Sequence, residues 1–308
     1  MEGGGRNRLW QILGIITVVA VVIILVRQLV VGWPAVKAYP WQWRWHYLAA
    51  SLAVMQIAYL ATARTWRSVL RAIDVRPDFK TAYWIFFISN LGRYLPGKVW
   101  QMGAAAMFGK RVGFSGRDMI TSMIVYQLYL FPIGAMLVLS FGALPAPYNE
   151  PVFQWTAWIL ALGAGCAAVW PHIVLRVMGP IARKLEIEPA RWKLELHRRL
   201  AIAVQSGFIW ACNGIGFALF VLAVTPMGPE HMIDLGRAYV GSYVIGYVTL
   251  VAPGGLGVRE AAITILLTPV LGPAPAAGLA LLSRLWVTVS ELIAIGPALW
   301  WARGANHH

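Results

Sequence analysis

Two apolar segments of this sequence are interrupted near their centres, by the runs Gly92-Arg93-Tyr94-Leu95-Pro96-Gly97-Lys98 and Pro253-Gly254-Gly255-Leu256-Gly257-Val258-Arg259-Glu260. The interrupted segments are Tyr83–Phe108 and Ala238–Leu271. In each break a Pro-Gly pair ends the helix, because proline lacks an amide donor and glycine adds backbone freedom. Each flanking arm has room only for a short helix, so the sequence predicts two re-entrant helical hairpins with tips near the middle of a membrane. The predicted tip residues are Pro96, Gly97, Pro253, Gly254, Gly255 and Gly257.

The composition places these breaks in a membrane. Of the 308 residues, 59% are hydrophobic and 12% are charged, and the mean hydropathy is +0.64. Soluble chains carry about 25% charged residues. Several apolar runs reach the ~20 residues that a helix needs to cross the hydrocarbon core. We expect full spans at Leu9–Val31, His46–Ala63, Ile120–Phe141, Val152–Leu175, Ile202–Val224 and Ala277–Trp301. The predicted fold class is an all-α polytopic membrane protein, with about six full spans and two re-entrant hairpins in a single integral membrane domain over residues 1–308.

The basic residues lie mainly in the connectors between apolar runs, although the formal net charge is +14. The connectors Arg64–Lys80 and 176–200 are rich in Lys and Arg, whereas Gly142–Pro151 and Thr225–Leu235 contain neither. Basic connectors stay on the cytoplasmic side of a membrane. We therefore expect 176–200 to be a cytoplasmic connector and both termini to be cytoplasmic. Attraction to anionic lipid headgroups accounts for the charge, so nucleic acid is not expected as a partner.

The two hairpins occupy equivalent places in two halves of the chain. The unit span–hairpin–span occurs over 46–141 and again over 202–301. With the N-terminus in the cytoplasm, the chain reaches the first hairpin from the cytoplasm and the second from outside, so the units form an inverted repeat. Such paired interruptions are typical of transporters that bind substrate where the tips meet. In a second interpretation Ala238–Ala252 crosses the membrane, which makes the second break a cytoplasmic loop and removes the symmetry.

Charged residues within the hydrocarbon region are costly, at about 2.5–3.5 kcal/mol each on insertion scales, so they are usually functional or paired. At the breaks and in the last span, these residues are Arg93, Lys98, Arg259, Glu260, Arg284 and Glu291. Four cations against two carboxylates predict a net positive cavity. Such a cavity suits a phosphate, which binds bidentate arginines and helix N-termini. The two glutamates are expected to balance this charge or to carry a coupling proton.

A structural interpretation of the same charges stays open. In it, Arg259 with Glu260 and Arg284 with Glu291 form ion pairs that hold the bundle together. The two cations of the first break have no acidic neighbour in the sequence. Their isolation favours a substrate-binding role for them.

Motifs that would indicate an enzyme or a cofactor site are absent from the sequence. It has no nucleophile elbow, no HExxH, no CxxC and no Walker-type phosphate loop. Cys166 and Cys212 lie inside apolar runs, where cysteines are usually inert packing residues. We therefore expect no metal, no cofactor and no catalytic residue. Gln127, Asn213 and Ser290 are expected to form hydrogen bonds between helices.

The two breaks together resemble the flippase-like membrane domain of bacterial lysylphosphatidylglycerol synthases and of related stand-alone membrane proteins. The resemblance rests on Asn90-Leu91-Gly92-Arg93-Tyr94-Leu95-Pro96-Gly97-Lys98-Val99-Trp100 and on Pro253 to Glu260, and it extends from the second span to the C-terminus. In the synthases this domain is thought to move an aminoacylated lipid between leaflets, and a soluble domain makes that lipid. The 308 residues hold no counterpart of the soluble domain, so lysyl transfer is not implied. Stand-alone relatives are linked to hopanoid, cell-envelope glycolipid and lipid-linked sugar pathways.

The leading hypothesis is a lipid transporter of the bacterial inner membrane, which moves an anionic phospholipid, lipid-linked phosphate or glycolipid between leaflets. The residues expected to bind its substrate are Arg93, Lys98, Arg259 and Arg284. The alternative is a non-transporting accessory subunit that binds a glycosyltransferase or another lipid-modifying enzyme through the connector 176–200. A membrane enzyme that acts on lipid phosphates is a third, weaker hypothesis.

Overall fold

The computed structural model describes residues 30, 33–34, 37–94, 99–140, 151–177, 179, 194–248, 255 and 257–305. The regular elements in these ranges are all helices, and the ranges contain no strand. The predicted first span, Leu9–Val31, lies outside them apart from Val30. Also outside the described residues are Pro96, Gly97, Lys98, Pro253 and Gly254. The all-α prediction is confirmed for the described part of the chain.

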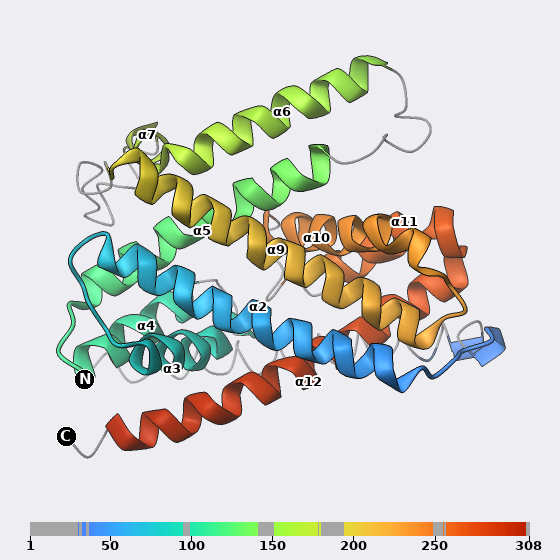
Figure 1. Ribbon diagram of the computed structural model, residues 1–308, viewed down its shortest axis with the longest axis horizontal. Coiled ribbons are helices and arrows are strands. Elements are labelled where there is room, and N and C mark those ends of the chain that lie inside the picture. Colours follow the sequence, from blue (N-terminus) through green and yellow to red (C-terminus); the bar gives the residue numbers. More distant parts are fainter. Residues whose placement is uncertain are drawn as a thin grey trace, which may run out of the picture.

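Four helices in the described part are long and apolar enough to cross a membrane. They are α2 (Trp45–Arg71), α5 (Gly116–Ser140), α9 (Leu196–Val224) and α12 (Pro273–Ala305). Each coincides with one of the predicted spans. α2 and α9 run in opposite directions along each other (Figure 1), and Ser51 Oγ donates to Gly216 O between them at 2.7 Å. The prediction of a polytopic membrane protein is confirmed by these helices together.

The predicted span Val152–Leu175 is divided into two helices in the structure, so the prediction of one continuous helix is wrong. α6 (Pro151–Val169) ends before Trp170, and α7 (Pro171–Val177) begins directly after it. Pro171 has no amide hydrogen and cannot continue the hydrogen bonding of α6, but it suits the first position of a new helix. α6 packs mainly on α5 at the edge of the bundle (Figure 1).

Both interrupted segments form antiparallel pairs of short helices. The first helix pair is α3 (Phe79–Asn90), continued by the 3₁₀ helix η1 (Leu91–Tyr94), and α4 (Val99–Arg111). The second helix pair is α10 (Met232–Val248) and α11 (Val258–Leu271). These α-helices have 12 to 17 residues and are shorter than the four long helices. The interruptions therefore fall where the sequence predicts them.

At the inner end of each helix pair, a glycine allows the two segments of the pair to approach closely. A Cβ on Gly92 would lie 2.8 Å from Gln101 N, and a Cβ on Gly255 would lie 3.1 Å from Gly246 O. Gly255 also has a φ of +70°, which residues with a side chain rarely adopt. The first pair lies toward one end of the bundle and the second toward the other (Figure 1), so their inner ends approach the centre.

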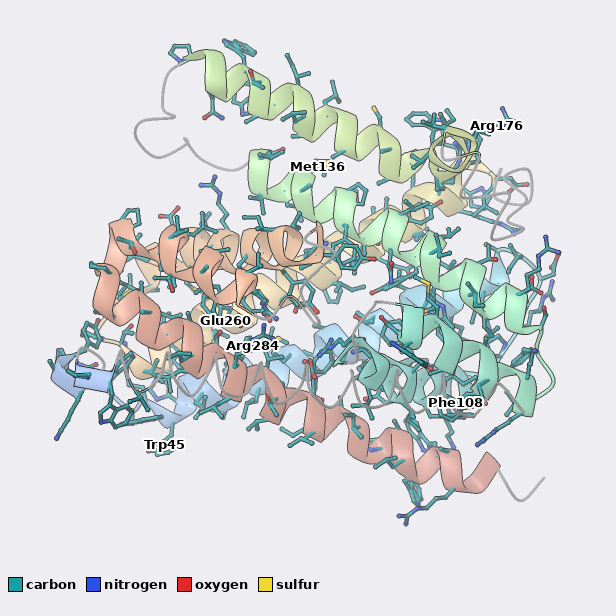
Figure 2. All side chains as sticks on the ribbon, turned by 180° about the vertical axis from the view of Figure 1, so that it is seen from behind. Trp45, Phe108, Met136, Arg176, Glu260 and Arg284 are labelled. Atoms are coloured by element: carbon teal, nitrogen blue, oxygen red, sulfur yellow. The ribbon has the colours of Figure 1, made fainter. Side chains whose placement is uncertain are left out.

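Basic residues are more numerous at one end of the bundle than at the other. One end, the basic end, holds the last turns of α2, α4 and α12 and the first turns of α3, α5 and α9 (Figure 1). Its basic residues in the described part include Arg64, Arg67, Arg71, Lys80, Lys110, Arg111, Arg117, Arg198, Arg199 and Arg303. Figure 2 shows Arg176 and Phe108 toward this end and Trp45 toward the other. The opposite end carries Glu230 in the 3₁₀ helix η3 (Pro229–His231) and Asp234 in α10.

Two aromatic-rich clusters pack the helices on either side of the centre. One includes Trp66 and Tyr83 and surrounds the first helix pair. The other includes Phe217 and Trp286 and joins α9, α10 and α12. Because buried aromatic rings interlock in few arrangements, these clusters fix the helix pairs in position and so fix the residues at their inner ends.

Candidate functional site

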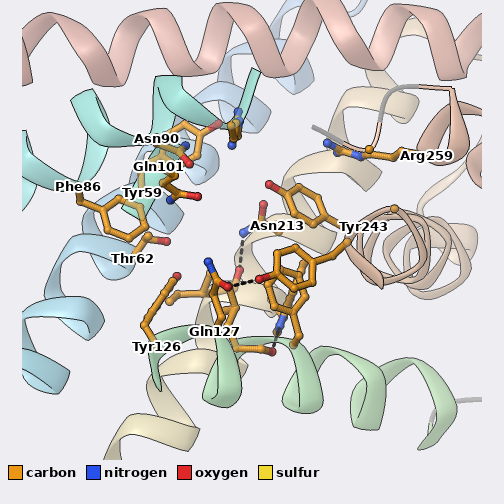
Figure 3. A pocket seen from close by; sticks show the side chains of 18 of the residues that line it. Tyr59, Thr62, Phe86, Asn90, Gln101, Tyr126, Gln127, Asn213, Tyr243 and Arg259 are labelled. Carbon is orange, nitrogen blue, oxygen red and sulfur yellow. Dashed lines mark hydrogen bonds between the residues drawn. The ribbon is translucent and has the colours of Figure 1, made fainter. Parts of the chain in front are cut away.

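A cavity lies at the centre of the bundle, between the inner ends of the two helix pairs. Its empty volume is about 1180 Å³, including the part open to the surroundings. Its polar lining residues include Tyr59, Thr62, Asn90, Arg93, Gln101, Tyr126, Gln127, Asn213, Tyr243, Tyr247, Arg259 and Arg284. Figure 3 shows Arg259 reaching into the cavity from one side, with Asn90, Gln101 and Thr62 on the opposite side. Both halves of the chain therefore contribute polar groups to one internal space.

The cavity brings together arginines from three places in the sequence. Arg93 comes from η1 at the inner end of the first helix pair, and Arg259 comes from the first turn of α11 in the second. Arg284 comes from α12, and Gly255 contributes backbone beside Arg259. Of the predicted substrate-binding residues, these three arginines lie in one cavity, while Lys98 lies outside the described residues.

Two ion pairs connect the helix pairs to α12. Arg93 of the first pair bonds to Glu291, and Glu260 of the second pair bonds to Arg284. The four side chains are between 4% and 19% exposed, so these pairs are largely shielded. Breaking such a pair leaves a buried charge without compensation, which typically costs about 3–5 kcal/mol.

These pairs differ from those that the sequence suggests. Arg259 and Glu260 are consecutive in a helix, so their side chains point in different directions and do not face each other. Arg284 and Glu291 are separated along α12 by about 10.5 Å, the length of two turns, which is too far for a direct contact. Arg93 has no acidic neighbour in the sequence, and it pairs with the carboxylate of Glu291 on α12.

Glu260 is held by both of its carboxylate oxygens. Oε1 accepts from Arg284, and Oε2 accepts from the backbone N–H of Gly257 at 2.6 Å. The second contact satisfies a donor at the start of α11, where a negative charge is also favoured by the helix dipole. Glu260 therefore links the beginning of α11 to α12.

Arg259 is buried between two tyrosines. It is 6% exposed, and its guanidinium carbon lies 4.6 Å from the ring centroid of Tyr239 and 4.3 Å from that of Tyr243. Its Nε and Nη2 atoms have no hydrogen-bond partner within the described part of the chain, and the same holds for Nη2 of Arg284. Buried donors left unpaired are costly, so the site retains capacity for a ligand that accepts hydrogen bonds.

The electrostatics of the site favour an anion. Three arginines face two glutamates among the described residues, which leaves one excess positive charge. A planar guanidinium can donate two parallel hydrogen bonds to a phosphate or a carboxylate. Within the described residues, no three His, Cys, Asp or Glu side chains lie together so as to hold a metal ion.

The uncharged polar residues only partly behave as the sequence predicts. Gln127 of α5 accepts from the hydroxyl of Tyr247 on α10, which is a bond between helices. Asn213 and Ser290 instead donate to carbonyls of their own helices, to Ile209 O and Trp286 O, at 2.8 Å each. Gln127 and Asn213 both line the cavity, which the sequence analysis did not predict.

Sequence reasoning also missed the tyrosines of α10. Tyr239, Tyr243 and Tyr247 follow one another at intervals of four residues, so they share one helix face. That face meets Arg259 and the cavity. The interval was visible in the sequence and could have identified the face as one that binds a cation or a polar ligand.

Apolar helices long enough to cross a membrane, packed around an internal polar cavity, define a polytopic α-helical membrane protein. The chain matches the family model for the lysylphosphatidylglycerol synthase TM region over residues 11–294, and it belongs to this family. No curated protein and no solved structure matches it. The resemblance carried by the two breaks is thereby confirmed, and a membrane role related to lipids follows from the family.

Proposed function

We propose that this protein moves an anionic lipid between the leaflets of the bacterial inner membrane, with the phosphate of the headgroup held in the central cavity. The observation that carries the proposal is Arg259, which is buried, reaches into the cavity and keeps unpaired N–H donors within the described part of the chain. A phosphate matches the planar guanidinium of Arg259 in charge and in hydrogen-bonding geometry. Membership of a lipid-related membrane family supports a lipid as the source of that phosphate.

Transport is proposed in place of catalysis because of how the charges are distributed. The glutamates of the site pair with arginines on other helices, so among the described residues these carboxylates link helices and do not form a pair that faces a reacting group. Interrupted helices that meet at a binding site are typical of secondary transporters. The protein is accordingly proposed to act without a chemical step, and Glu260 and Glu291 are proposed to balance the charge or carry a coupling proton.

The proposed topology is an inverted repeat, with both helix pairs re-entrant. The units are 46–141 and 202–301, and their long helices α2 and α9 run in opposite directions (Figure 1). Each helix pair then starts from the end of the bundle that its long helix has reached. The positive-inside rule places the basic end, with the last turn of α12, in the cytoplasm.

Cysteine labelling tests this topology in a background that lacks Cys166 and Cys212. Lys80→Cys lies at the basic end and Glu230→Cys at the opposite end. In intact spheroplasts, a membrane-impermeant maleimide should label Glu230→Cys directly and Lys80→Cys only after permeabilisation. The reverse pattern would invert the proposed orientation, and labelling of both from one side would rule out the proposed topology.

A reconstitution assay tests the function. Liposomes that contain the protein and a phosphatidylglycerol with a fluorescent acyl chain are treated with dithionite, which bleaches lipid in the outer leaflet. The wild-type protein should make lipid from the inner leaflet accessible, whereas Arg259→Gln should not. Arg198→Gln is the matched control, because Arg198 is exposed at the basic end and lies outside the cavity lining.

Two outcomes would contradict the proposal at different points. Wild-type vesicles that behave like empty ones would refute transport and favour the accessory-subunit hypothesis, for which loss of a bound lipid-modifying enzyme on changing 176–200 is the decisive observation. Normal transport by a folded Arg259→Gln variant would instead refute the assignment of the phosphate site.

A further inference from the structure

The neutral part of the cavity lining is rich in side-chain amides. Asn90, Gln101, Gln127 and Asn213 come from four different helices, α3, α4, α5 and α9. Figure 3 shows the four amides around the space into which Arg259 reaches. Any headgroup whose phosphate contacts Arg259 would therefore place its remaining atoms among amides.

The hydrogen bonds that two of these amides make show which of their donor and acceptor groups remain unused. Gln127 accepts from Tyr247 through Oε1, so its NH₂ group remains a donor. Asn213 donates through Nδ2 to Ile209 O at 2.8 Å, so its side-chain carbonyl remains an acceptor. Asn90 and Gln101 form no side-chain hydrogen bond within the described part of the chain. The lining thus offers both donors and acceptors. A hydroxyl group both donates and accepts hydrogen bonds, so it can be satisfied by such a lining.

The same lining is poorly suited to an amine. One oxygen of Glu260 pairs with Arg284 and the other with Gly257 N, while Glu291 pairs with Arg93. An ammonium group would therefore meet an excess of positive charge, and both glutamates near it are already engaged by other partners.

We infer that the cavity selects an anionic lipid whose headgroup carries hydroxyl groups beyond the phosphate, such as a glycerol or a sugar, over a lipid whose headgroup carries an amine. The phosphate contacts the unpaired donors of Arg259 and Arg284, and the hydroxyls contact the amides of Asn90, Gln101, Gln127 and Asn213. This inference rests on the proposed function for the position of the phosphate, and it adds the chemistry of the rest of the headgroup.

Calorimetric binding of short-chain lipids to the full chain in detergent tests the selection. Dioctanoyl phosphatidylglycerol should bind at least tenfold more tightly than the phosphatidylethanolamine of the same chain length, which replaces hydroxyls by an amine. It should also bind several-fold more tightly than phosphatidylethanol, which keeps the single negative charge but has no hydroxyl. The first comparison measures rejection of the amine, and the second measures recognition of the hydroxyls.

Variants assign the preference to the amides. Asn213→Leu and Gln101→Leu should each lower the affinity for phosphatidylglycerol relative to phosphatidylethanol several-fold. Gln205→Leu is the matched control on α9, because Gln205 lies toward the basic end and outside the cavity lining; it should keep the wild-type ratio. Thermal melting of each variant checks folding, and the comparison of lipids on the wild-type protein does not depend on any variant.

The inference and the proposed function fail in different ways. Equal affinity for phosphatidylglycerol and phosphatidylethanolamine, or for phosphatidylglycerol and phosphatidylethanol, would overturn the inference even if lipids are transported. Preferential binding of phosphatidylglycerol in a protein that moves no lipid would uphold the inference and refute transport.

Discussion

Replacement of Arg259 by methionine distinguishes a ligand-binding role of this residue from a structural one. Methionine has a similar length and can pack between Tyr239 and Tyr243, but it has no charge and no donors. If Arg259 serves to hold the bundle together, its loss should lower the free energy of unfolding. If it serves to bind an anion, its loss should weaken binding while stability changes little.

Two opposing contributions set the stability of Arg259→Met. The variant loses contacts of the guanidinium with two tyrosine rings at 4.6 and 4.3 Å, and each cation–π contact contributes roughly 0.5–2 kcal/mol. It also relieves two buried donors, Nε and Nη2, that lack partners in the described part of the chain, and each such donor costs roughly 1–3 kcal/mol. Loss and gain are of similar size, so the free energy of unfolding should stay within about 2 kcal/mol of the wild type.

Binding should change much more than stability. A phosphate that accepts from both free donors gains two charge-assisted hydrogen bonds, each contributing about 1.5–3 kcal/mol. Even the lower values add up to about 3 kcal/mol, which corresponds to roughly a 100-fold weaker Kd for dioctanoyl phosphatidylglycerol. Calorimetry in detergent measures this ratio, and transport by Arg259→Met in the dithionite assay should fall to the level of empty vesicles.

The opposite combination of results would refute this reasoning. A variant that melts far below the wild type, while its folded fraction binds the short-chain lipid with unchanged affinity, would show that Arg259 is structural. Arg198→Met serves as the control, because this exposed arginine lies outside the cavity lining, and its loss should affect neither quantity. Arg259→Lys should fall between wild type and methionine in affinity, because lysine keeps the charge but lacks the planar fork.

Two further predictions concern the packing around the site, and melting in detergent measures both. Glu291→Ala removes the glutamate of Arg93 and should lower the free energy of unfolding by about 3–5 kcal/mol; adding Arg93→Ala should restore most of the loss, and no recovery would mean that the charge was not the cause. Gly255→Ala places a Cβ 3.1 Å from Gly246 O at a φ of +70° and should cost roughly 1–3 kcal/mol. Gly163→Ala, whose Cβ would meet nothing within 4 Å, should be neutral or slightly stabilising, and equal effects of the two substitutions would contradict the strain at Gly255.

The fold class and the interruptions could be predicted because their signals are local. A long apolar run needs no partner to be recognised as a membrane helix, and α2, α5, α9 and α12 coincide with such runs. The first helix pair likewise follows from a Pro-Gly pair within an apolar segment. The prediction of one helix over Val152–Leu175 is wrong for an equally local reason. Pro171 lies within that apolar run, and a proline inside a helix usually ends or kinks it.

The ion pairs of the site could not be predicted in the same way. Pairing depends on which faces of different helices meet in space, and the order of charges along one helix does not contain this information. Arg93 and Glu291 belong to opposite halves of the chain. Glu260 turns away from its neighbour Arg259 because adjacent side chains of a helix diverge. The positions of the charges were thus readable from the sequence, whereas their partners required the fold.

The two ion pairs make α12 a common anchor for both helix pairs, and this suggests how binding and movement are coupled in the proposed transporter. Glu291 attaches the first helix pair through Arg93, and Arg284 attaches the second through Glu260. A phosphate that contacts Arg284 competes with Glu260 for the same guanidinium. The other oxygen of Glu260 holds Gly257 N at the start of α11, so weakening the ion pair also loosens the helix start beside the cavity. A lipid whose headgroup carries no negative charge cannot compete with Glu260 for Arg284, and it would leave the second helix pair attached to α12.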